Sequence, residues 1–426
     1  MSEAVVVPAI GTGSSLACVR SLGRRGIPVV AAAASESAPA AASKYCRETA
    51  VVPDPSTGLG AYRDALLALA DRDDVLTVVP LREPDAYVLA QNRDRFAERV
   101  AAPWPAFETF ERVRDRRRLF DVAETAGVPA PETEVLDGWD VRARDAVVKS
   151  RYTVLVEDDA TAYPDVTVVP AGTDPDPDAL EERMGHRPLV QEYVPGTDEY
   201  GFFALCDRGD PVTTFQHRRV RSYSYTGGAS VFRKAVDEPD LREHGTALLS
   251  ALDWHGPAMV EFRRDPRDGR FKLLEVNPRF WGSLQLAVHA GVDFPHEYYR
   301  LAAGDGASAG REEPARETGD GPSDVAAEST YETGVGSHVL RGELAYLASL
   351  LREGHDPAER PSLPAETARI LASLWREPNF DYCSRDDPKP FVRDAAGVVD
   401  EYAPSLSGVA AAGRAVPTVA RRLWRR

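Results

Sequence analysis

Short apolar runs alternate with amphipathic segments over the first 112 residues. Buried strands of a parallel sheet read as continuous apolar runs, and the helices between them show a period near 3.6. The runs lie at 5–8, 28–33, 50–53 and 76–80, and the helical patterns at 16–25, 60–70 and 85–96. This alternation predicts a Rossmann-like parallel α/β domain over residues 1–112.

The pattern changes after residue 112. A helix is predicted over 113–127, and residues 132–300 then show strand patterns of the antiparallel kind with helices between them, which indicates an α+β body. Residues 304–330 are acidic and poor in apolar positions, so they predict a linker. Helical patterns return from residue 331, and 331–426 form a C-terminal extension whose end is locally basic.

Two strands joined by a polar turn at 264–270 carry the most informative polar residues. The second strand places Glu275, Asn277 and Arg279 at a spacing of two, so their side chains share one face. A hairpin would bring Glu261 opposite Glu275. Two carboxylates and a carboxamide oxygen suit Mg²⁺, and Arg279 can hold a phosphate with two hydrogen bonds. The alternative is a solvated sheet face with chance carboxylates.

Other segments carry single candidates that are each compatible with an ordinary surface role. Lys149 ends an apolar strand and could reach a phosphate. The strand 191–194 could present its backbone to a base, and Glu199 could accept both ribose hydroxyls. Arg116 begins a helix among further arginines, where a phosphate would balance the charge. Arg218 stands on a cationic strand before a Gly-Gly loop that could close over phosphates.

Composition narrows the functional classes. Asp and Glu number 67 against 51 Lys and Arg, and the net charge of −16 argues against nucleic-acid binding. Only five of the basic residues are lysines, which predicts a halophilic, haloarchaeal protein, although a GC-rich genome would also favour arginine. Four scattered cysteines indicate reduced thiols in a cytoplasm. Neither a signal peptide nor a membrane span is expected.

The order of these segments over residues 4–300 resembles the ATP-grasp superfamily of carboxylate–amine ligases, in particular the carbamoyl-phosphate synthase large-subunit type. The resemblance implies a pre-ATP-grasp domain over 1–112 and an ATP-grasp domain over 113–303 with lobes at about 113–185 and 186–303. It implies ATP with Mg²⁺ or Mn²⁺ as cofactors. The residues it assigns to ATP are Arg116, Lys149, Gln191, Glu192, Tyr193, Val194 and Glu199; to the metal, Glu261, Glu275 and Asn277; to catalysis, Arg279 and Arg218.

The resemblance implies an ADP-forming ligase that joins a small carboxylate to an amine through an acyl phosphate, as a possible homodimer. Two other functions stay open. A NAD(P)-dependent oxidoreductase could use the Gly11-x-Gly13 turn with Glu36 as the ribose ligand, but position 16 is Leu where a dinucleotide fingerprint has its third glycine. A nucleotide-binding regulatory protein without catalysis is the second.

Overall fold

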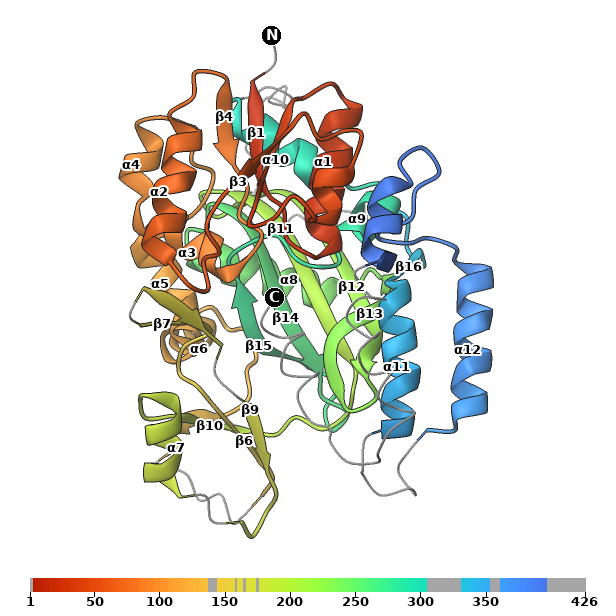
Figure 1. Cartoon of the computed structure of the whole chain (residues 1–426). Coiled ribbons are helices and arrows are strands. Elements are labelled where there is room, and N and C mark those ends of the chain that lie inside the picture. The colour runs from red at the N-terminus through yellow and green to blue at the C-terminus, as the bar shows by residue number, and fades with distance from the viewer. Residues whose placement is uncertain are drawn as a thin grey trace, which may run out of the picture.

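A computed structural model of the chain describes residues 3–136, 144–157, 159–163, 166–173, 176–304, 331–352 and 361–396. Figure 1 shows the N-terminal sheet and its helices above a large antiparallel sheet, with a smaller sheet below and a pair of helices at the side. The predicted linker from residue 305 to 330 and the basic end at 414–426 lie outside the described residues.

The N-terminal region forms the predicted parallel sheet, with strand order β3-β2-β1-β4. Register pairs such as Val5 with Val29 show the parallel alignment of neighbouring strands. All five residues of β1 and of β2 are buried, which explains why these strands read as unbroken apolar runs. The elements are β1 (Ala4–Pro8), α1 (Gly13–Arg24), β2 (Val29–Ala33), the 3₁₀ turn η1 (Pro39–Ala42), β3 (Glu48–Val51), α2 (Leu59–Ala70), β4 (Val75–Val78), α3 (Glu83–Gln91) and α4 (Arg93–Ala97).

Two predicted helices differ from the structure in their bounds. The pattern over 85–96 is split at Asn92 between α3 and α4. The helix expected over 113–127 is present as α6 (Arg116–Thr125), but it begins later than expected because α5 (Phe107–Arg114) ends just before Asp115. Asp115 is extended and its carboxylate accepts a hydrogen bond from the Arg117 backbone N–H at 3.1 Å. It therefore caps the second helix, a role that suits Asp at a helix start.

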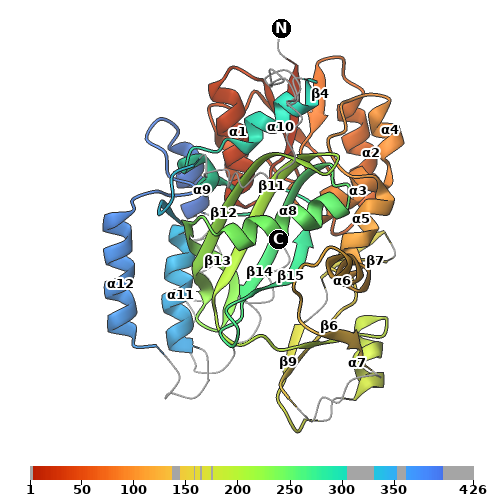
Figure 2. The same cartoon turned by 180° about the vertical axis from the view of Figure 1, so that it is seen from behind.

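A six-stranded antiparallel sheet forms the centre of the molecule, in the order β15-β14-β11-β12-β13-β16 (Figures 1 and 2). Phe202, Val260 and Phe262 pack one face against α8 and α6, and Phe203, Phe215 and Met259 pack the other against α1 and α10. Its elements are β11 (Glu199–Asp207), β12 (Asp210–Ser224), β13 (Gly227–Ala235), α8 (Pro239–Ala251), β14 (Gly256–Arg264), β15 (Phe271–Asn277), α9 (Leu284–His289), α10 (Phe294–Ala302) and β16 (Gly336–His338).

A smaller antiparallel sheet, β5-β10-β6-β9, lies below the large one in Figure 1 with α7 beside it. Its core contains Val148, Val169, Met184 and Val190, so few apolar side chains hold this part together. The elements are β5 (Thr133–Val135), β6 (Ala146–Lys149), β9 (Val166–Val169), α7 (Pro177–Met184) and β10 (Leu189–Glu192), with the separate hairpin β7 (Leu155–Glu157) and β8 (Ala160–Ala162).

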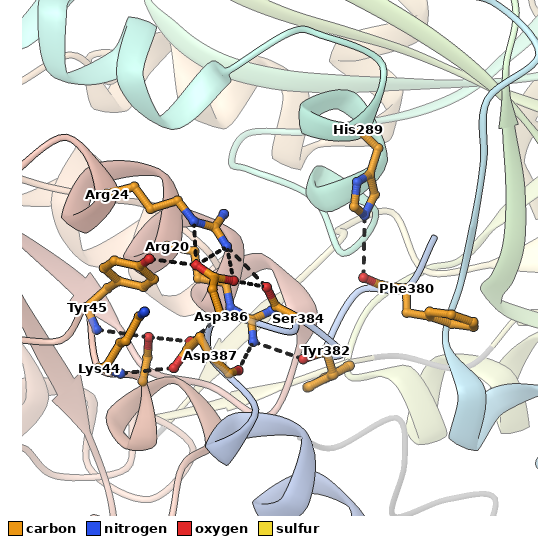
Figure 3. Close-up of polar contacts among 11 residues, drawn as sticks. Arg20, Arg24, Lys44, Tyr45, His289, Phe380, Tyr382, Ser384, Asp386 and Asp387 are labelled. Atoms are coloured by element: carbon orange, nitrogen blue, oxygen red, sulfur yellow. Dashed lines mark hydrogen bonds and ion pairs between the residues drawn. The ribbon is translucent and has the colours of Figure 1, made fainter. Parts of the chain in front are cut away.

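The C-terminal extension is built into both other regions. Strand β16 adds an edge to the large sheet by pairing with β13, and helices α11 (Leu340–Arg352) and α12 (Leu363–Arg376) follow it. Residues 382–387 then lie against the N-terminal domain, as Figure 3 shows, whereas Phe380 lies beside His289 of α9. Arg20 of α1 donates to the Asp387 carboxylate at 3.0 Å, and both side chains are almost fully buried. Ser43 and the Lys44 backbone N–H also donate to the Asp387 carboxylate, and we call these interactions of Asp387 the docking contact.

No helix among the described residues is both long and apolar enough to cross a membrane.

Candidate active site

One face of the large sheet carries the residues that the strand pattern singled out. Glu261 of β14 pairs directly with Glu275 of β15, as the hairpin predicted, and Met259 pairs with Asn277. On the other side, Glu261 pairs with Gly201 of β11. Directly paired residues point to the same face, so Glu261 and Glu275 stand side by side. This face lies towards the N-terminal domain.

A bulge in β15 refines the predicted alternation. Glu261 opposes Glu275 and the next residue, Phe262, opposes Leu273, which leaves Leu274 without a directly paired residue. Leu273 and Val276 consequently pack into the core on the far side of the sheet. The bulge lets Leu273 turn inward while Glu275, two residues later, faces the opposite way.

The two carboxylates are electrostatically unequal. Burial and the neighbouring charge of Glu275 raise the pKa of Glu261 to about 7. Burial also acts on Glu275, but the charges of Arg116, Lys149 and Arg279 outweigh it, so the pKa of Glu275 is lowered. Asn277 donates from Nδ2 to Glu261 Oε1 at 3.2 Å. Two adjacent, partly exposed carboxylates with an amide beside them form an oxygen-rich group that a divalent cation would stabilise.

Arg116 reaches this face from the first turn of α6. Its Nη2 donates to Glu275 Oε2 at 2.9 Å, and its Nη1 donates to the carbonyl oxygens of Ser150 and Tyr152. The cap at Asp115 sets where the helix begins and therefore where Arg116 stands. The Nε atom of Arg116 is buried without a hydrogen-bond partner among the described residues.

Lys149 ends β6 in the smaller sheet and is buried at 6% exposure. Its Nζ donates to Gln191 Oε1 at 2.8 Å and lies 5.2 Å from the centre of the Phe120 ring. Burial lowers the pKa of Lys149 to about 7, and the charge of Arg116 acts in the same direction. An anion near Lys149 would reverse that shift, so the position suits a phosphate.

Arg279 joins the sheet to the N-terminal domain. It lies two residues after β15, and its Nη2 donates to Asn277 Oδ1 at 2.9 Å. Its Nε donates to Glu83 Oε1 at 2.9 Å, from a residue 196 positions earlier in the chain. Four separate segments thus converge in what we call the candidate site: Arg116, Lys149, Glu261, Glu275, Asn277 and Arg279.

The structure does not bring Arg218 into the candidate site. Arg218 pairs with Tyr200, whose side chain faces the α8 side, and it forms an ion pair with Asp198 at 2.8 Å. Arg219, one residue later, faces the other way and lies 4.0 Å from Glu261. Strand alternation fixes this difference, and the register of β12 could not be read from its run of basic residues.

Glu199 and the segment 191–194 lie at the edge between the two sheets. Glu199 is ion-paired with both Arg219 and Arg263, so neither carboxylate oxygen is free of a cation. The backbone N–H groups of Glu192 and Tyr193 donate to the carbonyl oxygens of Glu132 and Asp145. The Glu192 side chain pairs with Arg267.

Some Val194 and Gln191 groups are also engaged. The Val194 carbonyl accepts from Arg263 at 3.1 Å, and Gln191 Nε2 donates to Thr133 while its oxygen accepts from Lys149. Gln191 therefore contacts Lys149 of the candidate site through its side chain, whereas the sequence suggested only a backbone role for the strand 191–194.

Two site-facing residues, Glu83 and Arg219, were not expected from the sequence. The Arg218-Arg219 pair offered a signal for the second, but Glu83 lies in a helix start without any local motif. Among the described residues no three His, Cys, Asp or Glu side chains are grouped as a metal site. A cation at Glu261 and Glu275 would therefore need the Asn277 oxygen, water or a ligand oxygen as well.

Comparisons with known proteins agree with this arrangement. A family model described as "ATP-grasp in the biosynthetic pathway with Ter operon" matches residues 186–320, which include Glu261, Glu275, Asn277 and Arg279. A sequence search of curated proteins finds no match.

Three solved structures share the fold at low sequence identity. An L-amino acid ligase from Bacillus licheniformis has 18% identity and a TM-score of 0.53, with 71% of this chain and 74% of that chain covered. N5-carboxyaminoimidazole synthetase from Staphylococcus aureus has 15% identity and a TM-score of 0.53, with 70% and 76% covered. The biotin carboxylase domain of a Hydrogenobacter thermophilus 2-oxoglutarate carboxylase, solved with MgADP and bicarbonate, has 16% identity and a TM-score of 0.55, with 71% and 70% covered.

Residues 186–320 thus resemble an ATP-grasp family, and the three solved structures show that the chain shares their fold.

Proposed function

We propose that this protein is an ADP-forming ligase that joins a small-molecule carboxylate to an amine. The observation that carries the proposal is the convergence of two paired carboxylates, one amide and three cationic side chains from four separate segments. Glu261 and Glu275 come from adjacent strands, and Arg116 and Lys149 come from α6 and β6. A mixture of carboxylates and cationic side chains suits a complex of a metal ion with a nucleotide better than it suits a metal ion or a nucleotide alone.

ATP would bind between the large and the small sheet. Lys149 and Arg116 would hold its phosphates, and Arg279 would contact the transferred phosphoryl group. The strand 191–194 would receive the base and Glu199 the ribose, which requires Arg219 and Arg263 to share the Glu199 oxygens with the hydroxyls.

Mg²⁺ or Mn²⁺ would be held by Glu261, Glu275 and the Asn277 oxygen. The fit rests on the desolvation and the like charges of the paired carboxylates, which together raise the pKa of Glu261 and which a cation would offset. When bound, such a cation neutralises charge on the phosphates. Arg279 would have to release the Asn277 oxygen for this, because it occupies that acceptor at 2.9 Å.

The reaction would proceed in two displacements. A substrate carboxylate oxygen attacks the γ-phosphorus, the bond to the β,γ-bridging oxygen breaks, and ADP leaves. An amine nitrogen then attacks the acyl carbon of the acyl phosphate, the carbon–oxygen bond to phosphate breaks, and phosphate leaves as the nitrogen loses a proton. Arg279 and Arg219 are the cations we assign to the transferring group, with Arg219 in place of the originally expected Arg218.

The surroundings of the Gly11-x-Gly13 turn disfavour the oxidoreductase alternative. A Cβ placed on Gly13 would lie 2.9 Å from Asp381 Cβ, and the Tyr382 hydroxyl donates to the Gly11 carbonyl at 2.7 Å. The extension therefore covers the helix N-terminus where a dinucleotide phosphate would bind. A regulatory protein without catalysis would not need the candidate site to keep both carboxylates and all three cations.

The decisive experiment measures ADP and phosphate release from MgATP with pools of amino acids, dicarboxylates and amines. We expect release only when a carboxylate is present, and a condensed product when an amine is added. Glu275→Gln serves as the inactive comparison. Release that ignores every carboxylate, or that is equal in Glu275→Gln, would contradict the proposal.

A further inference from the structure

Glu83 stands where the N-terminal domain meets the candidate site. It is the first residue of α3, five residues after the end of β4 in the parallel sheet. Ligands of parallel α/β sheets bind at the carboxyl ends of the strands, so this is the edge at which such a sheet presents groups to a ligand. Glu83 is only 5% exposed.

The Glu83 carboxylate is tied to the reaction centre by one of its two oxygens. Oε1 accepts from Arg279 Nε at 2.9 Å. Burial raises the pKa of Glu83, the Arg279 charge opposes that shift, and Glu275 and Arg116 also act on it. The Glu83 carboxylate therefore interacts electrostatically with residues that we assign to the metal and to the phosphates.

The other oxygen of Glu83 has no hydrogen-bond partner among the described residues, although it is buried. A buried acceptor left unsatisfied costs about 1–3 kcal/mol. A purely structural Arg–Glu bridge can avoid this cost, as Arg221 does by donating to both oxygens of Glu343 at 2.9 and 3.1 Å. The Glu83 bridge uses one oxygen and leaves the second available.

We propose that this second oxygen of Glu83 binds the amino group of the amine substrate, as part of the ligase activity proposed above. A carboxylate oxygen accepts hydrogen bonds and repels phosphate and carboxylate groups, so a cationic N–H donor suits it best. The same side chain contacts Arg279, so a bound nitrogen would lie beside the group that holds the transferred phosphate. The substrate class is a primary amine that is protonated in solution and that gives one proton to solvent before its nitrogen attacks the acyl phosphate.

Glu83→Gln tests the proposal because it can keep the acceptor for Arg279 and convert the free acceptor into an N–H₂ donor. The carboxylate substrate in this experiment is the compound that gives the highest ADP release in the screen described above. Two nucleophiles are compared: the amino-acid pool, whose amines are protonated, and hydroxylamine, which is uncharged at slightly alkaline pH and traps an acyl phosphate as a hydroxamate.

We expect the KM for the amine to rise about 10-fold to 100-fold in Glu83→Gln, as for a lost hydrogen bond to a charged group. Hydroxamate formation and the affinity for a non-hydrolysable ATP analogue should stay close to the parent. Glu108→Gln is the matched control, because Glu108 is also an acid in a first helical turn but is exposed and is not part of the candidate site.

Three results would overturn the proposal in distinguishable ways. An unchanged KM for the amine would show that Glu83 does not bind it. An equal loss with both nucleophiles would show that Glu83 acts only by holding Arg279. A parent protein that forms neither ADP nor hydroxamate with any carboxylate would contradict the ligase function itself, and the assignment of Glu83 with it.

Discussion

The docking contact and the candidate site are both groups of buried charges that join distant segments, but they differ in completeness. In the docking contact each Asp387 oxygen has a donor: Arg20 and Ser43 donate to one and the Lys44 backbone to the other. Arg116 Nε in the candidate site and Glu83 Oε2 beside it lack partners among the described residues.

The two groups also differ in how their charges are arranged. Asp387 is paired with a cation, whereas Glu275 faces Glu261 as well as its partner Arg116, and Lys149 lies close to Arg116. Like charges at close range raise the free energy of the folded protein unless a ligand offsets them. Paired charges therefore hold the extension in place, and unpaired or like charges identify the surface that awaits a ligand. This contrast yields five predictions.

Breaking the docking contact should have the largest effect on stability. Asp387→Ala leaves the buried Arg20 guanidinium without its carboxylate, and we expect the free energy of unfolding to fall by about 3–5 kcal/mol. Chemical denaturation measures this change. Asp386→Ala is the control, because the Asp386–Arg24 pair is exposed and should contribute about 0–1 kcal/mol. Equal losses in both variants would mean that burial is not what makes the contact strong.

Changing the candidate site should instead lower turnover at nearly unchanged stability. Arg279→Lys loses the forked donor set and Glu275→Gln loses a charge, and each should reduce turnover about 10²–10³-fold. Glu275→Gln should suffer most at limiting Mg²⁺. Val276→Ala is the matched control on the opposite face of β15, where we expect a loss of ~0.5–3 kcal/mol in stability with turnover per folded molecule preserved. Parent-like turnover in both site variants would make 275–279 a structural strand.

Nucleotide affinity should separate the roles of single site residues. Lys149→Ala should weaken binding of a non-hydrolysable ATP analogue about 10-fold to 100-fold, since a charge-assisted contact to phosphate is lost. Glu199→Ala should weaken it less, because ribose hydroxyls are uncharged. Calorimetric titration provides both values. Unchanged affinity in the two variants would remove both residues from the ATP site.

The lowered pKa of Lys149 predicts a pH dependence of stability. Its pKa is about 7 in the folded protein and near 10.4 in an unfolded chain, so the unfolded state binds more protons between these values. The contribution of Lys149 to stability should therefore increase as pH rises from 7 towards 10, by about 1.4 kcal/mol per pH unit at most. Denaturation at several pH values should show a smaller slope in Lys149→Met than in the parent. The same slope in both proteins would contradict the lowered pKa of Lys149 in the folded protein.

The smallest and most diffuse effect concerns salt. If the net charge of −16 reflects halophilic adaptation, molar KCl should raise the melting temperature by screening repulsion between exposed carboxylates. The buried Arg20–Asp387 pair should respond little, so Asp387→Ala should melt below the parent in both salts. A parent melting temperature that is equal or higher in low salt would remove the halophilic interpretation.

Local pattern determined a large part of this molecule. The unbroken apolar runs predicted the parallel sheet because its strands are covered on both faces. The alternation around 257–285 predicted the pairing of Glu261 with Glu275, since a hairpin joins strands that are adjacent in sequence. Both features depend on neighbours within a few tens of residues, so their signal is present in the sequence itself.

Only the tertiary structure decided the rest. The register of β12 placed Arg219 rather than Arg218 on the site face, and a shift of one residue reverses every side chain of a strand. The contacts of Arg279 with Glu83 and of Arg20 with Asp387 join residues 196 and 367 positions apart. Such pairs have no fixed spacing and no local propensity, because they form only once separately folded elements pack together.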